Sequence, residues 1–410
     1  MNVAEQLIRD VVVPETCLAD PAGFGGVATA EGRRGDLLVR DRAVSGMRAG
    51  EPSRAPRLVM PWVVEAHCHL DKCHTGARLG AVGGDLAAAI AAQLEDKVNW
   101  TAEDLRHRAG RGLAEAVANG CRLIRTHVDW GRDGAPPLAW DILGEFDGDG
   151  VRVQRAALTS AADLVEKGED IARHIARCDG VLGLFVLDQP ERRAGVRKAF
   201  ELADRFGLAL DFHVDEGLAE GLDGLELIAD MVLETGFQAP VLCGHACSMM
   251  NRSGVELARL LDKLEQSGLF VCALPTTNLY LQGRVTGTPD RRGITRLREL
   301  HEAGVPIVVG SDNVADAFCP TGQHNPVAAL DLAILGAHLD PPLARWLPAI
   351  TSSAARALGQ APVFVDRAKQ EDLAIVEGTL SDFIAGRAGP LRALAATSAP
   401  AVGVEGRDVG

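Results

Sequence analysis

One pattern of hydrophobic and polar positions repeats between residues 61 and 360. A short apolar run is followed by an amphipathic stretch with helical spacing, then by a Gly, and then by the next apolar run. Apolar runs of this length are typical of strands buried on both faces, and a Gly after a helical stretch supplies the left-handed residue that ends a helix. Eight runs fit the pattern, at residues 63–70, 122–129, 151–158, 181–187, 208–213, 241–245, 269–274 and 305–312.

Strands that alternate with helices indicate a parallel sheet covered by helices. Eight such units within about 300 residues predict a closed (β/α)8 barrel, known as a TIM barrel. An open, doubly wound sheet would need a Gly-rich phosphate-binding turn after an early strand, and the sequence has none. Residues 61–360 are therefore predicted to form the barrel. Its predicted helices include 196–206, 225–235, 255–267 and 294–303.

The two ends of the chain lack this repeat. Residues 1–60 are rich in Gly, Pro and Arg and contain short extended candidates at 10–14 and 36–39. After residue 361, strands are predicted at 362–366 and 373–376 and a helical fragment at 380–386. The Ala-, Pro- and Gly-rich tail from Ala395 onward predicts partial disorder. We expect residues 1–60 and 361–410 to build one small flanking β domain together.

Composition limits the possible partners and compartment. The 410 residues carry a net charge of −14, which argues against a nucleic-acid partner. Eighteen uninterrupted apolar residues occur nowhere, so we expect no membrane span. The first residues lack the basic and apolar segments of a signal peptide, and the nine Cys form no CxxC pattern. A cytoplasmic protein with buried, reduced cysteines is expected.

Polar residues that suit metal binding stand at the ends of five predicted strands. His67 and His69 are two residues apart, so they project to the same side of the first strand. In a barrel, the carboxyl ends of all strands meet at one mouth, where catalytic groups lie. The other strand-end residues are His127 and Asp129 on the second strand, and His213, His245 and Asp312 on the fifth, sixth and eighth. This arrangement predicts a site for a divalent cation.

The chemistry of such a site is hydrolytic. Three His and one Asp leave room for a water molecule, whose pKa the metal lowers. Asp312 would both bind the metal and accept the proton of that water. Glu216, three residues after His213, is either a proton shuttle or a solvated loop acid, and His245 is either a ligand or an orienting group. Leu187-Asp188 ends the fourth strand without the Lys that would bridge two metals, which favours one metal.

Several longer motifs carry a resemblance to a known family. The chain from about residue 61 to 359 resembles the amidohydrolase superfamily and, within it, the bacterial cytosine deaminase group. That family has a (β/α)8 barrel, a flanking β domain and one Zn²⁺ or Fe²⁺. The motifs are Val64-Glu65-Ala66-His67-Cys68-His69-Leu70-Asp71, Arg125-Thr126-His127-Val128-Asp129, His213-Val214-Asp215-Glu216, Asn278-Leu279-Tyr280-Leu281-Gln282-Gly283-Arg284, Arg291-Arg292-Gly293-Ile294-Thr295-Arg296 and Gly310-Ser311-Asp312-Asn313-Val314.

The resemblance assigns roles to individual residues. It implies that Glu216 protonates a ring nitrogen and assists the departure of ammonia, and that His245 positions the hydroxide. It also implies four metal ligands, His67, His69, His213 and Asp312.

The predicted substrate-binding residues depart from the cytosine deaminase pattern. Ser160 stands where the family has a Gln that holds the pyrimidine edge, and a hydroxyl cannot replace the paired contacts of an amide. Asn313 replaces an acid, and Phe318 replaces a Trp that covers the ring. His127 and Gln282 complete the predicted set. We therefore expect the hydrolytic chemistry to be intact, with a preferred substrate other than cytosine.

The leading hypothesis is a metal-dependent deaminase. Hydroxide held by the metal would attack an amidine-like carbon of a small N-heterocycle and release ammonia. Hydrolysis of an N-alkylamino heterocycle, such as N-isopropylammelide, or of a cyclic amide would use the same residues. An inactive, metal-stabilised binding protein is the alternative from another class, and the presence of Glu216 and Asp312 argues against it. The acidic surface and apolar helices permit a homo-oligomer.

Overall fold

The computed structural model describes residues 5–80, 82–131, 134–148, 150–285 and 291–398. The chain divides into two compact units. One contains Met1–Trp62, Val363–Phe383 and Arg387–Gly410, and the other contains Val63–Pro362 and Ile384–Gly386. The end of the Ala395 tail, from residue 399 onward, lies outside the described residues.

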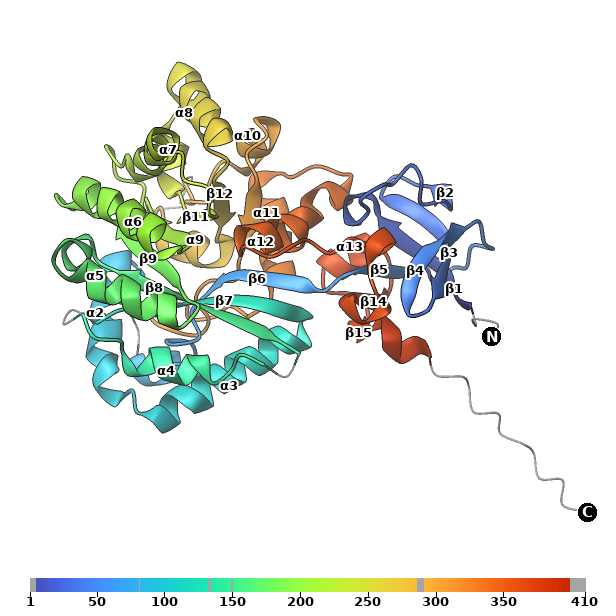
Figure 1. Ribbon diagram of the computed structural model, residues 1–410, viewed down its shortest axis with the longest axis horizontal. Coiled ribbons are helices and arrows are strands. Elements are labelled where there is room, and N and C mark those ends of the chain that lie inside the picture. The colour runs from blue at the N-terminus through green and yellow to red at the C-terminus, as the bar shows by residue number, and fades with distance from the viewer. Residues whose placement is uncertain (1–4, 81, 132–133, 149, 286–290, 399–410) are drawn as a thin grey trace, which may run out of the picture. The chain divides into compact units, whose positions relative to one another are not determined.

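The larger unit contains an eight-stranded parallel sheet whose strands follow one another in sequence order. Helices lie outside the strands (Figure 1). This arrangement confirms the predicted (β/α)8 fold, because all eight predicted strands are present. They are β6 (Val63–Cys68), β7 (Cys121–Asp129), β8 (Arg152–Thr159), β9 (Val181–Val186), β10 (Leu210–Val214), β11 (Val241–His245), β12 (Phe270–Ala273) and β13 (Ile307–Val309).

The first and last strands meet at a seam that has little hydrogen bonding. Between β6 and β13, the described residues show one isolated bridge, Cys68 to Asp312, in which the Asp312 N–H donates to the His67 carbonyl at 2.9 Å. Gly310 allows this close approach, because a Cβ there would lie 2.8 Å from the same carbonyl oxygen. The seam thus places the end of β13 directly beside His67.

The helices end largely as their sequences predict. Gly207, Gly236 and Gly268 adopt the left-handed conformation after α6, α7 and α8. The predicted helix 294–303 is shorter in the structure, as α10 (Leu297–Glu302). The longer helices are α2 (Leu86–Asp96), α3 (Ala102–Ala118), α4 (Leu138–Gly144), α5 (Ala161–Arg177), α6 (Arg192–Phe206), α7 (Gly224–Thr235), α8 (Gly254–Ser267), α9 (Pro275–Leu281) and α11 (Pro326–Ala337).

The barrel core explains why its strands read as continuous apolar runs. Every residue of β6, β10 and β11 is buried, so both faces of these strands are covered. Val64, Leu242 and Val308 pack in one cluster with Ala354 and Leu358, residues at and just after helix α12 (Ser352–Ala357). Apolar packing therefore fills one part of the barrel, whereas His67, His69 and Asp312 are buried polar residues at or just after the strand ends.

The other unit is a seven-stranded mixed sheet formed by both ends of the chain. The predicted strand at 362–366 is wrong: these residues form no strand, and Val365–Arg367 is a short 3₁₀ turn. A segment becomes a strand only if another strand pairs with it, and the sequence of residues 362–366 alone does not show whether such a partner exists. The strands are β1 (Gln6–Pro14), β2 (Val27–Ala28), β3 (Gly32–Arg40), β4 (Ala43–Arg48), β5 (Arg57–Pro61), β14 (Leu373–Glu377) and β15 (Arg392–Ala393), and α13 (Leu380–Ile384) follows β14.

One buried acid in this sheet is fully paired. Asp10, which is 7% exposed, lies at an irregularity in the β1–β3 register. Arg34 donates two hydrogen bonds to its carboxylate at 2.7 and 3.0 Å, and the Ser53 N–H donates a third at 2.7 Å. These bonds, Arg34 first, hold the pKa of Asp10 well below its usual range.

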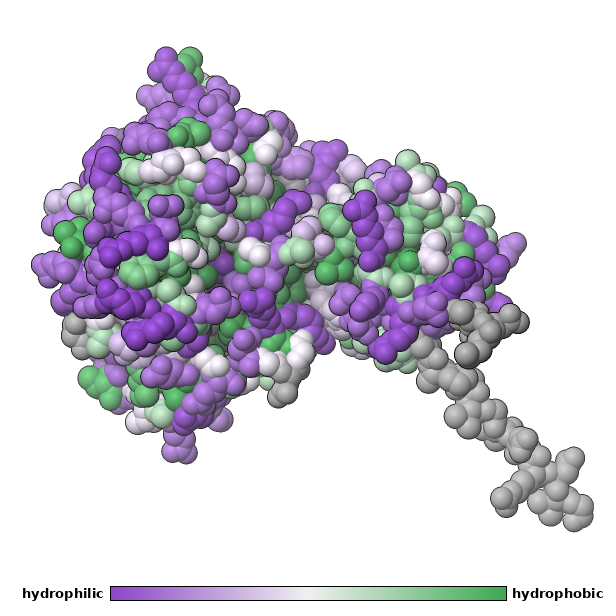
Figure 2. Space-filling view, viewed as in Figure 1, coloured by the Kyte–Doolittle hydropathy of each residue, from purple (hydrophilic) through white to green (hydrophobic). Residues whose placement is uncertain are grey.

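One face of the molecule is mostly polar. Figure 2 shows hydrophilic residues over most of the visible face, with apolar residues in small, separate areas. Among the described residues, every helix is too short or too polar to cross a membrane.

Candidate metal centre

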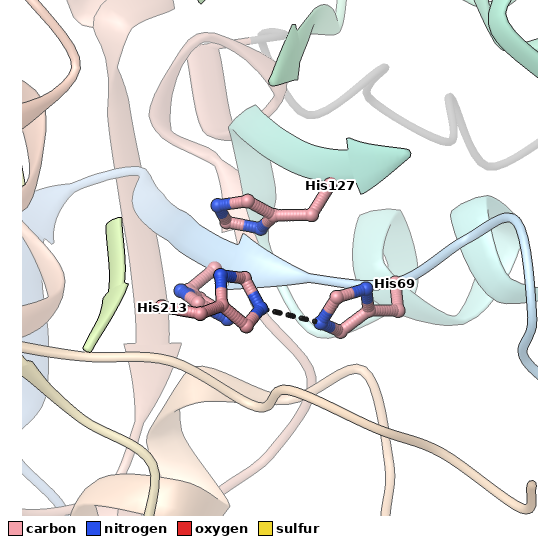
Figure 3. A group of neighbouring side chains, drawn as sticks. His69, His127 and His213 are labelled. Atoms are coloured by element: carbon pink, nitrogen blue, oxygen red, sulfur yellow. Dashed lines mark hydrogen bonds between the residues drawn. The ribbon is translucent and has the colours of Figure 1, made fainter. Parts of the chain in front are cut away.

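Four predicted ligands come together inside the barrel. His67 lies near the end of β6, His69 follows that strand, His213 lies on β10, and Asp312 follows β13. All four side chains are buried. The rings of His69 and His213 point toward each other, and His127 approaches from β7 (Figure 3). The predicted convergence of these strand ends is therefore present in the structure.

The distances between the ligand atoms fit a single cation. His69 Nε2 lies 3.1 Å from His213 Nε2 and 3.3 Å from Asp312 Oδ1, and His67 Nε2 lies 3.5 Å from the same oxygen. Ligands about 2.1 Å from a tetrahedral Zn²⁺ are separated by about 3.4 Å. These three pairs of ligand atoms have the spacing that such an ion requires.

Unpaired atoms support the same interpretation. Both ring nitrogens of His67 and both carboxylate oxygens of Asp312 are buried without a hydrogen-bond partner. Burial lowers the pKa of His69 and His213 well below the usual value, so these rings are neutral. Although burial raises the pKa of Asp312, the imidazoles of His67 and His69 bring it well below its usual value. Neutral imidazoles and a carboxylate are the forms that bind a divalent cation, and leaving them unpaired would be costly.

His127 belongs to the same cluster and has an acidic partner of its own. Its ring lies 4.0 Å from that of His67, and its Nε2 lies 3.0 Å from Asp211 Oδ1. Arg125 donates to the other oxygen of Asp211 at 2.9 Å. Although burial raises it, His127 and then Arg125 hold the pKa of Asp211 at about 2. Sequence analysis missed Asp211, although an acid two residues before His213 in an apolar strand was a usable signal.

Glu216 and His245 lie beside the candidate metal ligands. His245 Nε2 is 3.7 Å from Glu216 Oε2, and a ring nitrogen of His245 lies within 4.8 Å of ligand atoms of His67 and Asp312. Burial, and then the charge of Asp312, raises the pKa of Glu216 well above the usual value, which favours the protonated form of this carboxyl. Asn278 Nδ2 lies 3.1 Å from His245 Nδ1 and orients the ring. A carboxyl with a raised pKa and an oriented imidazole thus face the same small region.

Glu65 is a second residue that sequence analysis did not assign. It accepts backbone hydrogen bonds from His67 at 3.1 Å and from Ser311 at 3.2 Å. Burial raises its pKa to about 7. Glu65 therefore ties the strand that carries His67 to the residue before Asp312, across the seam.

The remaining predicted substrate residues occupy different environments. Asn313 is buried and donates to Asp316 Oδ2 at 2.7 Å, while the Gln282 amide lies 3.4 Å from the Glu216 carbonyl. Phe318 is buried with Lys72 Nζ 5.2 Å from its ring centre. Ser160 is exposed, and its hydroxyl caps α5 by accepting from the Asp163 N–H. Their contacts with substrate stay predictions.

The strand-end Asp129 does not join the ligand cluster. Its carboxylate lies 2.8 Å from Lys72 Nζ and 3.1 Å from Lys97 Nζ. Although burial raises it, the charge of Lys72 and then that of Lys97 bring the pKa of Asp129 well below the usual range. Asp129 is thus held as a paired carboxylate by two lysines.

Known proteins resemble this chain over most of its length. A model of the amidohydrolase family matches residues 99–363. The pterin deaminase of Rhizobium rhizogenes is 32% identical over 88% of this chain and 85% of its own. The N-isopropylammelide isopropyl amidohydrolase of Pseudomonas sp. strain ADP is 25% identical over 83% of this chain and 85% of its own.

A solved structure agrees with these sequence matches. The 5-methylcytosine deaminase of Klebsiella pneumoniae superposes with a TM-score of 0.77 at 25% identity, covering 94% of this chain and 95% of its own. The fold, the histidine-rich site of a divalent metal and the family match agree with one another. The chain is therefore an enzyme of the amidohydrolase family.

Proposed function

We propose that the protein is a metal-dependent hydrolytic deaminase of an amino-substituted N-heterocycle, with a pterin as the first candidate substrate. One observation carries this proposal. The Glu216 carboxyl, whose pKa burial raises, lies 3.7 Å from His245. His245 in turn has a ring nitrogen within 4.8 Å of ligand atoms of His67 and Asp312, so a proton donor and metal-binding groups meet in one buried place.

Three histidines and one aspartate suit one Zn²⁺ or Fe²⁺ ion. His67, His69, His213 and Asp312 would hold it. Bound there, the cation would act as a Lewis acid and lower the pKa of a water molecule.

The remaining chemistry belongs to side chains of this protein. Asp312 accepts a proton from the attacking water, and Glu216 delivers a proton to a ring nitrogen of the substrate. His245, oriented by Asn278, donates a hydrogen bond to the oxygen as the carbon becomes tetrahedral. The C–N bond then breaks: the amino group takes the proton held by Asp312 and leaves as ammonia. The hydroxyl proton returns to Glu216, and the ring keeps a carbonyl oxygen.

A pterin is the first candidate because it carries an amino group on a ring carbon between two nitrogens, which is an amidine-like centre. The relative at 32% identity is a pterin deaminase. Ser160, Asn313 and Phe318 replace the residues expected for cytosine, which supports a different ring.

Hydrolysis of an N-alkylamino heterocycle is the second candidate. It is favoured by the 25% identity to an N-isopropylammelide hydrolase along most of both chains. The leaving group would then be an alkylamine, released by the same proton transfers.

The test measures both products in one assay. Protein of known metal content is incubated with pterin, 5-methylcytosine, cytosine and N-isopropylammelide, and ammonia and isopropylamine are quantified. We expect ammonia from pterin at the highest kcat/KM. Isopropylamine as the main product would favour the second candidate. The absence of both amines from a metal-loaded protein would refute the proposal.

A further inference from the structure

A second group of metal-binding side chains lies outside the site described above. The ligand atoms of Cys73, His74 and His324 all lie within 4.8 Å of one another. Cys73 and His74 belong to the loop after β6, and His324 belongs to the loop between β13 and α11. Glu115, on α3, is next to them, with Oε2 4.0 Å from His74 Nε2.

Three ring nitrogens of this group are buried without a hydrogen-bond partner, two on His324 and one on His74. His324 is 0% exposed, and neither of its ring nitrogens has a partner. The Nε2 atom of His74 is also buried and unpaired. An imidazole that leaves water without a partner loses free energy, so unpaired buried nitrogens require an explanation.

The backbone of His74 gives an independent indication. Its φ of 59° lies in the left-handed region, which is unfavourable for a residue with a side chain. The His74 N–H donates to the Val314 carbonyl at 3.0 Å, which fixes the strained residue against the loop after β13. The rings of His74 and His324 lie near each other, with their centres 6.2 Å apart.

We propose that Cys73, His74 and His324 bind a second divalent cation, of the class of Zn²⁺, with Glu115 as the fourth ligand. One sulfur and two imidazole nitrogens favour Zn²⁺ over Mg²⁺ or Ca²⁺. Four protein ligands leave no position for substrate, so this ion is structural.

The charges of the surroundings are compatible with such an ion. A Cys73 thiolate and the Glu115 carboxylate together offset the two positive charges of the cation. Arg108 and Arg111 lie near enough to His74 to lower its pKa, after the effect of burial, and they oppose the cation. Arg108 is already paired with Asp104 at 2.8 Å, which reduces this opposition.

Modest side-chain movement would complete the geometry. Ligands of Zn²⁺ are about 3.4 Å apart, so the ligand atoms of Cys73, His74 and His324 must approach one another by up to about 1.4 Å. The Cys73 thiol is at present 3.5 Å from the carbonyl oxygens of Leu70 and Arg108. Those weak hydrogen bonds would be exchanged for a metal–sulfur bond.

The position of this group between two loops indicates what a bound ion would do. It would connect the loop after β6 to the loop after β13, across the seam that has one isolated bridge between the strands. The Cys73 N–H donates to the His69 carbonyl at 3.2 Å, so the same loop carries a ligand of the first site. An ion here would stabilise the closed barrel and hold His69 in place.

Cobalt substitution tests the proposal on the full chain. A Cys ligand gives Co²⁺ an intense near-ultraviolet thiolate charge-transfer band, which the all-His and Asp first site cannot produce. We expect the band in the cobalt-loaded protein, its loss in Cys73→Ser, and a fall from about two to about one bound ions per chain in His324→Asn.

Three control variants locate the signal. Asp312→Ala should keep the thiolate band, which separates this ion from the first site. Cys178→Ser should keep it too, because Cys178 lies 3.7 Å from His174 and is the competing thiol–imidazole pair. His338→Asn removes an exposed histidine and should leave the number of bound ions unchanged. A protein without the band, or a band that survives Cys73→Ser, would overturn the proposal.

Discussion

Two buried carboxylates, Asp10 in the flanking sheet and Asp312 in the barrel, show opposite ways of accommodating a charge. Asp10 receives two hydrogen bonds from Arg34 and one from the Ser53 backbone. Asp312 is 0% exposed, and neither of its oxygens has a hydrogen-bond partner. The neighbours of Asp312 are instead imidazole nitrogens, which in their neutral form include unprotonated acceptors.

This difference separates structural from functional polar groups. The hydrogen-bonding capacity of Asp10 is satisfied by groups of the protein itself. Asp312 and the imidazole nitrogens beside it are acceptors that face one another, so they require a cation from outside the chain. The same criterion identifies the group around His324. The predictions below test whether the two kinds of buried acid behave as differently as their surroundings indicate.

Replacing Asp312 should have the largest effect. Asp312→Ala removes a ligand and the proton acceptor, so we expect loss of the first metal and a fall in kcat/KM of about 10³-fold or more. Metal analysis and an ammonia assay on the same preparation measure both. Asp10→Asn is the matched control and should keep full metal content. A fully active Asp312→Ala enzyme would remove Asp312 from the site.

Glu216 should matter for turnover and not for metal binding. Glu216→Gln keeps the shape of the side chain but removes its proton donor, so we expect deamination to fall by about 10²- to 10⁴-fold with the metal retained. Glu220→Gln changes an exposed neighbouring residue and is the control, so its turnover and metal content should equal those of the wild type. Equal turnover in both variants would exclude Glu216 as the acid.

Asp10 should matter for stability and not for turnover. Asp10→Asn weakens hydrogen bonds to a charged group, so we expect the free energy of unfolding at pH 7 to fall by about 2 kcal/mol. Because the folded pKa of Asp10 is lowered, its contribution is present above the unfolded pKa, about 3.9, and is lost as the pH falls further. Denaturant titrations between pH 7 and pH 2 should show a flatter acid limb for the variant. An unchanged limb would contradict this pairing.

Ser160 should produce the smallest effect. If the missing amide accounts for the altered specificity, Ser160→Gln should raise activity on cytosine relative to the wild type. The same change removes the cap of α5 and should cost about 1 kcal/mol of stability. Steady-state kinetics with cytosine and pterin provide the measurement. Unchanged activity on cytosine would remove Ser160 from the specificity of the enzyme.

The sequence predicts what short-range patterns determine. Buried parallel strands carry continuous apolar residues, so all eight barrel strands were found, and the ligand pair His67 and His69 shares one strand end. Glu65 and Asp211 were missed because an acid in an apolar strand shows that a partner must exist without showing which strand supplies it. The strand predicted at 362–366 was wrong for the same reason, because strand formation depends on a pairing partner elsewhere in the sheet. The proximity of His324 and Cys73 was also not predictable, because the two residues meet only when the first and last strands of the barrel come together.

The weakly bonded seam between β6 and β13 also bears on how the enzyme is made. His67 is synthesised early, whereas Asp312 follows almost at the end of the barrel, and the two meet only at the seam. Contacts between residues so distant in sequence form late and slowly during folding. Binding of the metal would therefore indicate that the barrel has closed. A nascent chain that stops before residue 312 would lack a complete ligand set, whatever the supply of metal in the cell.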